Sequence, residues 1–344
     1  RIKSIVIMQR NHLISFLQVF GILLVVIGHS RQGAPAEPLW FTWIYSFHMP
    51  LFMFISGYLL RYGNERKGTS LATTPLYGSQ GFIWKKAKRL LVPYVSISTL
   101  AYLPKALLNR FTVRPVEISW DAYVHQFLYP WDNTIIFFWF LPTLFIIFLL
   151  AAYGARLLRR FDTLQGHLAL LAALLLLHLF NPAAHLRLLN LSGVASYLVY
   201  FFLGYYCCRY RIVDRLTTHI HAGAAASGLL SLALVTVVPD FMGKDLVAAC
   251  NGILLSILLG KIYIRHRARF LDHLYGASYA IYLFSWFPQV ASQQVFLSLI
   301  HAPWQVGSVL AIVTGTYLPL LIYKLIVRYK DTRAGRVVAF LTGQ

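Results

Sequence analysis

Charged residues are scarce in this chain, and acidic residues are the scarcest of them. Asp, Glu, Lys and Arg together make up 12% of its 344 residues, and only 11 residues are acidic. Hydrophobic residues make up 58%, which is more apolar surface than a water-soluble domain needs, and the apolar runs approach the ~20 residues that cross a bilayer. No soluble domain, low-complexity tract or clear internal repeat separates these runs. The sequence therefore predicts one all-α integral membrane domain over residues 1–344.

The chain also has few cysteines, and the three present have no spacing typical of a metal or redox motif. Cys207, Cys208 and Cys250 lie in or beside apolar runs, where they are predicted to be packing residues. No cluster of His, Cys and carboxylate residues has metal-ligand spacing either, so no metal is predicted. The formal charge of +20 is typical of basic loops beside anionic lipid headgroups. We therefore expect membrane lipids, and no nucleic acid, as partners.

Ten apolar segments can be marked along the chain, and basic residues alternate between the connections. The segments are residues 12–30, 39–60, 90–108, 134–153, 168–181, 192–208, 222–239, 245–262, 274–300 and 304–327. If the N-terminus is cytoplasmic, the cytoplasmic connections and ends hold 25 of the 31 Lys and Arg residues, and the outer connections hold six. Because basic residues accumulate on the cytoplasmic side, the sequence predicts a bundle of about ten transmembrane helices with both termini cytoplasmic.

Two regions of the chain, the N-terminus and the stretch 104–133, have features other than those of a membrane-spanning helix. The N-terminal basic residues, the first apolar run and an Ala-Pro-Ala sequence at 34–36 imitate a cleavable signal peptide, although the run is long for one and a proline lies in the cleavage box. The stretch 104–133 is rich in aromatic residues typical of the membrane boundary. This stretch is therefore predicted to carry a short interfacial helix.

The first apolar segment contains two polar residues, Gln18 and His29, within a run that has no formal charge. They are eleven residues apart, so at ~100° per residue they lie within ~20° of one helix face and ~16 Å apart along the axis. A histidine is costly to place against lipid and is therefore a functional candidate. His29 is a candidate general base, because a neutral imidazole accepts a proton from a hydroxyl near neutral pH. The alternative is that both residues make ordinary interhelical hydrogen bonds.

Further candidates are predicted at the same outer level as His29. His48 precedes a Met-Pro pair, so its side chain either contributes to the site or satisfies backbone groups beside the proline. Asp132 lies where the fourth apolar segment begins, so it either orients the His29 imidazole or caps the next helix. The residues predicted to contact a substrate are His48, Trp131 and Asn133.

A basic run, WKKAKRLLVP, leads into the third apolar segment. Within it Lys85 and Arg89 are four residues apart, and Lys86 and Arg89 are three apart, so they are neighbours on a helix surface. Such a cationic patch either binds a phosphorylated ligand at the inner mouth or anchors the helix to anionic lipid.

These stretches together resemble the acyltransferase-3 family of integral membrane acyltransferases. The matching pieces are GILLVVIGH ending at His29, FHMPLFMFISGYL at 47–59, KAKRLLVP at 86–93, FWFL at 138–141 and SYAIYL at 278–283. They follow the family's order and cover nearly the whole chain, and the second piece is the most specific.

The resemblance implies a multi-pass O-acyltransferase of the inner (cytoplasmic) membrane. Such an enzyme moves an acyl group, commonly acetyl from acetyl-CoA, to a hydroxyl of an extracytoplasmic saccharide or lipid-linked glycan of the cell envelope. The basic run is then expected to hold the phosphates of acyl-CoA, with Gln18 along the donor's arm. His29 is expected to be the general base, helped by Asp132, and direct attack on the thioester needs no acyl-enzyme.

Two positions depart from the family pattern. The family's first helix has an arginine where this chain has Gln18, so a permanent cation is replaced by a neutral hydrogen-bonding group. Many relatives have a histidine where this chain has Ser285, so no catalytic histidine is assigned there. Two other classes of protein remain as alternatives: a transporter or flippase for an anionic lipid or sugar, and a catalytically inactive relative that acts as an assembly partner.

Overall fold

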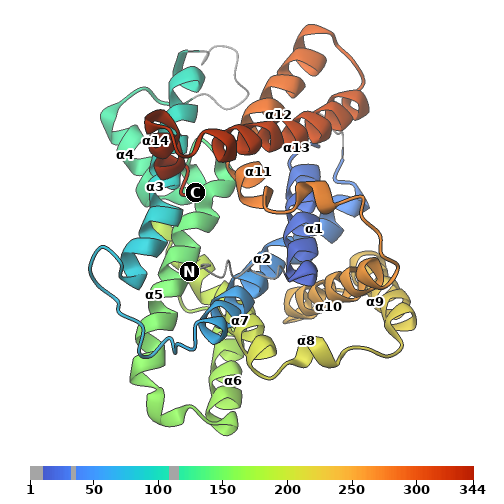
Figure 1. Cartoon of the computed structure of the whole chain (residues 1–344). Helices are drawn as coiled ribbons and strands as arrows, with labels where there is room; N and C mark the ends of the chain where they lie inside the picture. The colour runs from blue at the N-terminus through green and yellow to red at the C-terminus, as the bar shows by residue number, and fades with distance from the viewer. Residues whose placement is uncertain (1–10, 32–35, 108–115) are drawn as a thin grey trace, which may run out of the picture.

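The computed structural model describes residues 11–31, 36–107 and 116–344, and every regular element within these ranges is a helix. The α-helices are α1 His12–Gly28, α2 Leu39–Arg66, α3 Phe82–Leu107, α4 Trp120–Leu128, α5 Phe140–Leu157, α6 Leu164–Phe180, α7 Leu191–Arg209, α8 Ile212–Arg215, α9 Ile220–Thr236, α10 Lys244–Arg265, α11 Ser278–Phe284, α12 Trp286–Gln293, α13 Trp304–Tyr329 and α14 Arg333–Leu341. Short 3₁₀ turns are η2 Pro130–Asp132, η3 Ile136–Trp139, η4 Arg159–Phe161, η5 Leu188–Asn190 and η6 Asp272–Leu274, and η7 Gln294–Leu299 is a π-helix. Figure 1 shows α14 beside α3, and α12 alongside α13.

Within the described ranges, six helical segments are long and apolar enough to cross a membrane. They are Leu39–Arg66, Phe82–Leu107, Ile136–Leu157, Leu188–Arg209, Lys244–Arg265 and Trp304–Tyr329. The helices α1, α6 and α9 are also apolar but have 17 residues each, which at 1.5 Å per residue gives ~25 Å against a hydrocarbon core of ~30 Å. The protein is therefore a multi-pass helical membrane protein with six full-length candidate spans. The predicted number of about ten requires the shorter helices to cross as well.

The ninth apolar segment, 274–300, contains three consecutive helical elements, α11, α12 and η7. Ser285, between α11 and α12, keeps helical backbone angles and bonds Ile281 and Gln289 through its backbone. One helical hydrogen bond is missing there, because Pro288 has no N–H to donate to the carbonyl four residues earlier, that of Phe284.

The first helix lies inside the bundle. It packs against α2, α10, α11 and α13, and 11 of its 17 residues are buried. A helix that is apolar on all sides is expected to be buried on all sides. The polar end of α1 is therefore held within the protein.

Two glycines allow α2 and α7 to touch backbone to backbone. A Cβ atom at Gly57 would overlap the backbone oxygen of Phe201, and one at Gly204 would overlap the backbone oxygen of Phe54. Small residues at a helix crossing let the main chains approach closely, which is how many membrane helices gain packing energy. This crossing fixes α2, and therefore His48, relative to the middle of the bundle.

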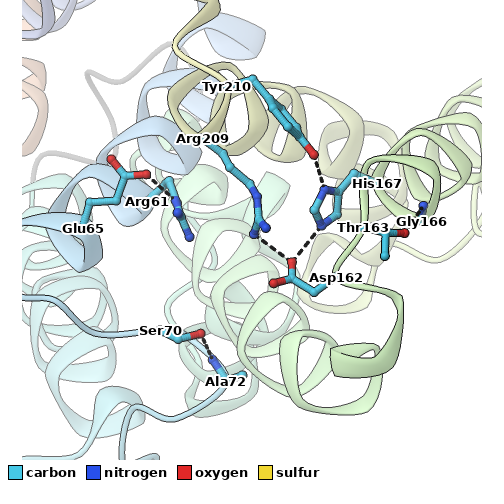
Figure 2. A network of polar contacts seen from close by, with 10 residues as sticks. All are labelled: Arg61, Glu65, Ser70, Ala72, Asp162, Thr163, Gly166, His167, Arg209 and Tyr210. Carbon is cyan, nitrogen blue, oxygen red and sulfur yellow. Dashed lines mark hydrogen bonds and ion pairs between the residues drawn. The ribbon is translucent and has the colours of Figure 1, made fainter.

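The connections assigned to the cytoplasm contact one another. Asp162 accepts hydrogen bonds from Arg209 at 2.7 Å and from His167 at 2.9 Å, and Tyr210 lies 2.6 Å from the second nitrogen of His167 (Figure 2). Partial burial favours the protonated acid, but the hydrogen bonds from Arg209 and His167 outweigh it and hold the pKa of Asp162 below its usual value. These contacts join the connection between α5 and α6 to the end of α7.

The connections assigned to the outside also contact one another. Arg187 pairs with Asp132 at 2.8 Å, which joins the segment before α7 to the segment before α5. The helix predicted in the stretch 104–133 is present as α4. The connections that contact each other are those that the alternation of basic segments places on the same side of the membrane. The count of Lys and Arg residues assigns the more basic side to the cytoplasm.

Replacing Gly57 with Ala is expected to destabilise the folded protein, because the added methyl group meets backbone that cannot rotate away. The cost should reach at least the ~1–3 kcal/mol typical of overpacking. Gly63→Ala in the same helix is the matched control, since nothing lies within 4 Å of a Cβ there. The measurement is the temperature at which half of the detergent-solubilised protein loses its monodisperse chromatographic peak. Equal midpoints for both variants would contradict the close crossing.

Candidate functional site

His29 lies directly after the last residue of α1 and is half-buried. Its ring centroid is 4.8 Å from that of Phe137 in η3 and 6.1 Å from that of Tyr45 in α2. No hydrogen bond joins the His29 ring to another residue in the described parts of the chain. The imidazole is therefore packed beside aromatic rings, and neither ring nitrogen bonds a described residue. A general base needs a nitrogen that is free to take a proton.

His48 lies on the other side of Tyr45, with a distance of 4.7 Å between the two ring centroids. The Nδ1 atom of His48 is 2.8 Å from the backbone oxygen of Ile44. Because a carbonyl only accepts, Nδ1 carries the proton, and the neutral ring presents Nε2 as an acceptor. The side chain thus bonds a backbone carbonyl one turn earlier in α2. The carbonyl that loses its donor to Pro50 is a different one, that of Ser46.

A path of aromatic side chains connects His29 with the basic run. Phe137 is 5.5 Å from Tyr282 of α11, and the Tyr282 hydroxyl donates to the backbone oxygen of Phe137 at 2.8 Å. Tyr282 stacks on Tyr279 at 6.5 Å, and the Arg89 guanidinium lies 5.1 Å from the Tyr279 ring. The hydroxyl of Tyr279 also donates to the backbone oxygen of Arg89. We call Phe137, Tyr282 and Tyr279 the aromatic path.

The three basic residues of the predicted patch have different environments. Lys85 and Arg89 are exposed. The ammonium group of Lys86 points instead at the face of Phe148, 3.5 Å from its ring centroid, with Phe82 at 5.4 Å. A lysine over an aromatic ring gains a cation–π attraction. Lys85 and Arg89 are therefore the cations that an incoming anion meets first.

Gln18 is half-buried, and its side chain has no hydrogen bond to any residue that the structure describes. Between Gln18 and His29, the same face of α1 carries Ile22 and Val25, which are 0% and 3% exposed. Apolar packing therefore separates the two polar residues along α1. The aromatic path is the connection between the two ends of the site.

Asp132 contacts residues other than His29. Its two carboxylate oxygens bind His125 at 3.1 Å and Arg187 at 2.8 Å. It also does not cap a helix, because it ends η2 and Ile135 is the residue that precedes η3. The N-cap expectation was wrong because the chain turns again at Asn133 before the helix begins.

Trp131 and Asn133 differ in what they leave accessible. The Trp131 indole N–H donates to Asn190 at 2.9 Å, and its ring stacks on Trp139 at 4.9 Å, yet 41% of the residue is exposed. The buried Asn133 oxygen accepts from Ser98 at 3.1 Å and from the Ile135 N–H at 2.9 Å. Asn133 thus holds the turn, while Trp131 presents a fixed, open ring face.

Sequence reasoning missed two further residues at the end of α1. Gln289 and Gln293 of α12 are both buried and donate to α1. Two glutamines four residues apart in an apolar segment share one helix face, and this signal could have identified them. Phe137 was also missed, since one more aromatic residue in an aromatic-rich stretch gives no signal.

Comparison with known proteins identifies the family. A family model described as an acyltransferase domain, Acyl_transf_3, matches residues 11–324. No curated protein and no solved structure was found to match the chain. The matched region extends from the first described residue into α13 and includes every site residue described above. The chain therefore belongs to the acyltransferase-3 family of membrane acyltransferases.

Proposed function

We propose that this protein is a membrane O-acyltransferase that moves an acetyl group from cytoplasmic acetyl-CoA to a hydroxyl of an extracytoplasmic saccharide or lipid-linked glycan. The observation that carries the proposal is one connected set of side chains with exposed cations at one end and an available imidazole at the other. Membership of the family indicates that the reaction is acyl transfer. The distribution of Lys and Arg residues indicates the orientation, in which Arg89 faces the cytoplasm at the inner membrane.

On the donor side, Lys85 and Arg89 provide the positive charge for the phosphates of acetyl-CoA. Guanidinium and ammonium groups both bind phosphate well, and Arg does so with a planar pair of donors. Lys86, drawn into the bundle by Phe148, adds a cation deeper along the same route. The half-buried Tyr279 beside Arg89 is the aromatic side chain nearest these cations that can contact the donor's adenine.

The aromatic path is filled by its own rings, since Phe137 and Tyr282 are 4% and 8% exposed. The pantetheine arm therefore enters by displacing the Tyr282 ring toward the neighbouring aromatic residues, while Phe137 stays beside His29. A path that opens only for the donor keeps water away from the thioester, and hydrolysis without an acceptor is suppressed.

At the outer end, His29 takes the proton from the acceptor hydroxyl as its oxygen attacks the thioester carbonyl. The new C–O bond forms, the C–S bond breaks, and the departing thiolate of CoA receives a proton, either from the His29 imidazolium or from water. His48, neutral and presenting Nε2, accepts a hydrogen bond from the acceptor in this arrangement. The open face of Trp131 contacts the saccharide ring further out.

Replacing His29 with Ala is expected to lower acetyl transfer by ~10²–10⁴-fold, the range contributed by a positioned general base. The measurement is incorporation of labelled acetyl from acetyl-CoA into the glycan fraction of membranes that contain the protein. His221→Ala, which alters an exposed histidine, is the control and should retain activity. Normal transfer by the His29 variant, at an unchanged level of folded protein, would remove His29 as the base.

Charge reversal of Lys85 and Arg89 to Glu is expected to raise the KM for acetyl-CoA, with the largest effect at low ionic strength because salt screens exposed charges. Lys324 and Arg328 are a matched pair, also exposed, also four residues apart and assigned to the same side. Their reversal should leave the KM unchanged. If both double variants behave alike, the basic run is a lipid anchor.

Acetyl-CoA is expected to raise the unfolding temperature of the purified protein, whereas free acetate is not. A ligand that binds the folded state alone stabilises it by RT ln(1 + [L]/Kd). The measurement is a thermal unfolding curve in detergent with increasing acetyl-CoA, CoA or acetate. Stabilisation by none of the three would contradict a donor site.

A further inference from the structure

The C-terminal end of α1 receives hydrogen bonds from another helix. The last carbonyl groups of a helix have no intrahelical partners, and in an apolar bundle an unpaired carbonyl is costly. In α1, the side-chain nitrogen of Gln289 donates to the backbone oxygen of Val26 at 2.8 Å and to the Ser30 hydroxyl at 2.8 Å. Ser30 in turn donates to the same Val26 oxygen at 2.7 Å. Gln289, from α12, thus completes the capping of the C-terminal end of α1 that Ser30 begins.

A second glutamine extends this contact to His29 itself. The side-chain nitrogen of Gln293, one turn after Gln289, donates to the backbone oxygen of His29 at 3.4 Å. Both glutamines are 3% exposed. Hydrogen bonds from one face of α12 therefore hold the main chain both before and after the His29 Cα atom.

The third helix of this arrangement is α13, where Gly315 leaves room for Gln289. A Cβ atom at Gly315 would lie 2.6 Å from Cγ and 3.1 Å from Cδ of Gln289. The glutamine side chain is thus pressed between α13 and the end of α1, and it has no space in which to turn its amide away. Packing on one side and two hydrogen bonds on the other fix its position.

We infer that Gln289 is the positioning residue for His29: it holds the end of α1 so that the imidazole stays between Phe137 and Tyr45. This inference rests on the proposed role of His29 as the base. The ring has no hydrogen-bonding partner of its own among the described residues, so its place depends on its backbone and on those two rings. Misplacement of a catalytic group by ~1 Å costs up to ~10²-fold in rate, so loss of Gln289 should act on the chemical step.

A purely structural role for Gln289 makes a different prediction. Any buried hydrogen bond between helices stabilises a membrane protein modestly, and its loss would lower thermal stability without a selective effect on His29. Ser292 provides the comparison, because its hydroxyl bonds Thr314 at 2.8 Å and joins α12 to α13 without touching α1.

The test compares Gln289→Met, which keeps the length of the side chain and removes both donors, with Ser292→Ala. Gln289→Met should lower the kcat of acetyl transfer by ~10–10²-fold with little change in the KM for acetyl-CoA, and Ser292→Ala should change neither. The second measurement needs no acceptor: the rate at which diethyl pyrocarbonate modifies His29, followed by peptide mass spectrometry with the exposed His221 as internal reference. We expect His29 to react at least threefold faster in Gln289→Met, because its ring leaves its aromatic packing.

Gly315→Ala perturbs Gln289 without removing it and should reproduce both effects. Gly154→Ala is its control, since a Cβ there meets nothing within 4 Å. An unchanged kcat and an unchanged His29 modification rate in Gln289→Met would overturn the inference. Failure of the proposed function has a separate signature: His29→Ala would then retain full activity, while the modification rates would still report whether Gln289 holds His29.

Discussion

A helix that ends inside an apolar bundle leaves carbonyl groups that must find donors, and the way α1 meets this requirement determines where His29 lies. The donors come from Ser30 and from Gln289 and Gln293, which are more than 250 residues away in the chain. Water cannot take their place at low cost in such surroundings. The position of the imidazole is therefore tied to the association of α1 with α12, and through Gly315 with α13.

The aromatic path solves a second problem, which is to connect two polar ends through an apolar interior. Its rings fill the space between Arg89 and His29, so the interior between the two ends is packed. The Tyr282 hydroxyl is paired with the Phe137 backbone oxygen, which satisfies a buried polar group while keeping the ring in place.

The sequence predicted the helical membrane class, the family and the placement of His29 at the end of the first helix, because these depend on composition, local motifs and helix periodicity. It did not predict the partners of Asp132, which took His125 and Arg187, since hydrophobic patterning says nothing about which loop lies beside another. The glutamines of α12 illustrate the same limit: their spacing is visible, but the carbonyls that they pair with are distant in the chain. The hydrogen bond missing near Ser285 can be read from the sequence, because Pro288 has no N–H to donate.

The paired glycines of α2 and α7 also restrict how the protein can move. Where main chain meets main chain, no side chain can change rotamer to accommodate a shift, so these two helices act as one rigid unit that carries Tyr45 and His48. The ring that the acyl donor displaces under the proposed function, that of Tyr282, belongs instead to the short α11, which ends at Phe284 before Pro288. In that proposal, adaptation to differently sized acyl donors is concentrated in one wall of the route, and the opposite wall stays unchanged.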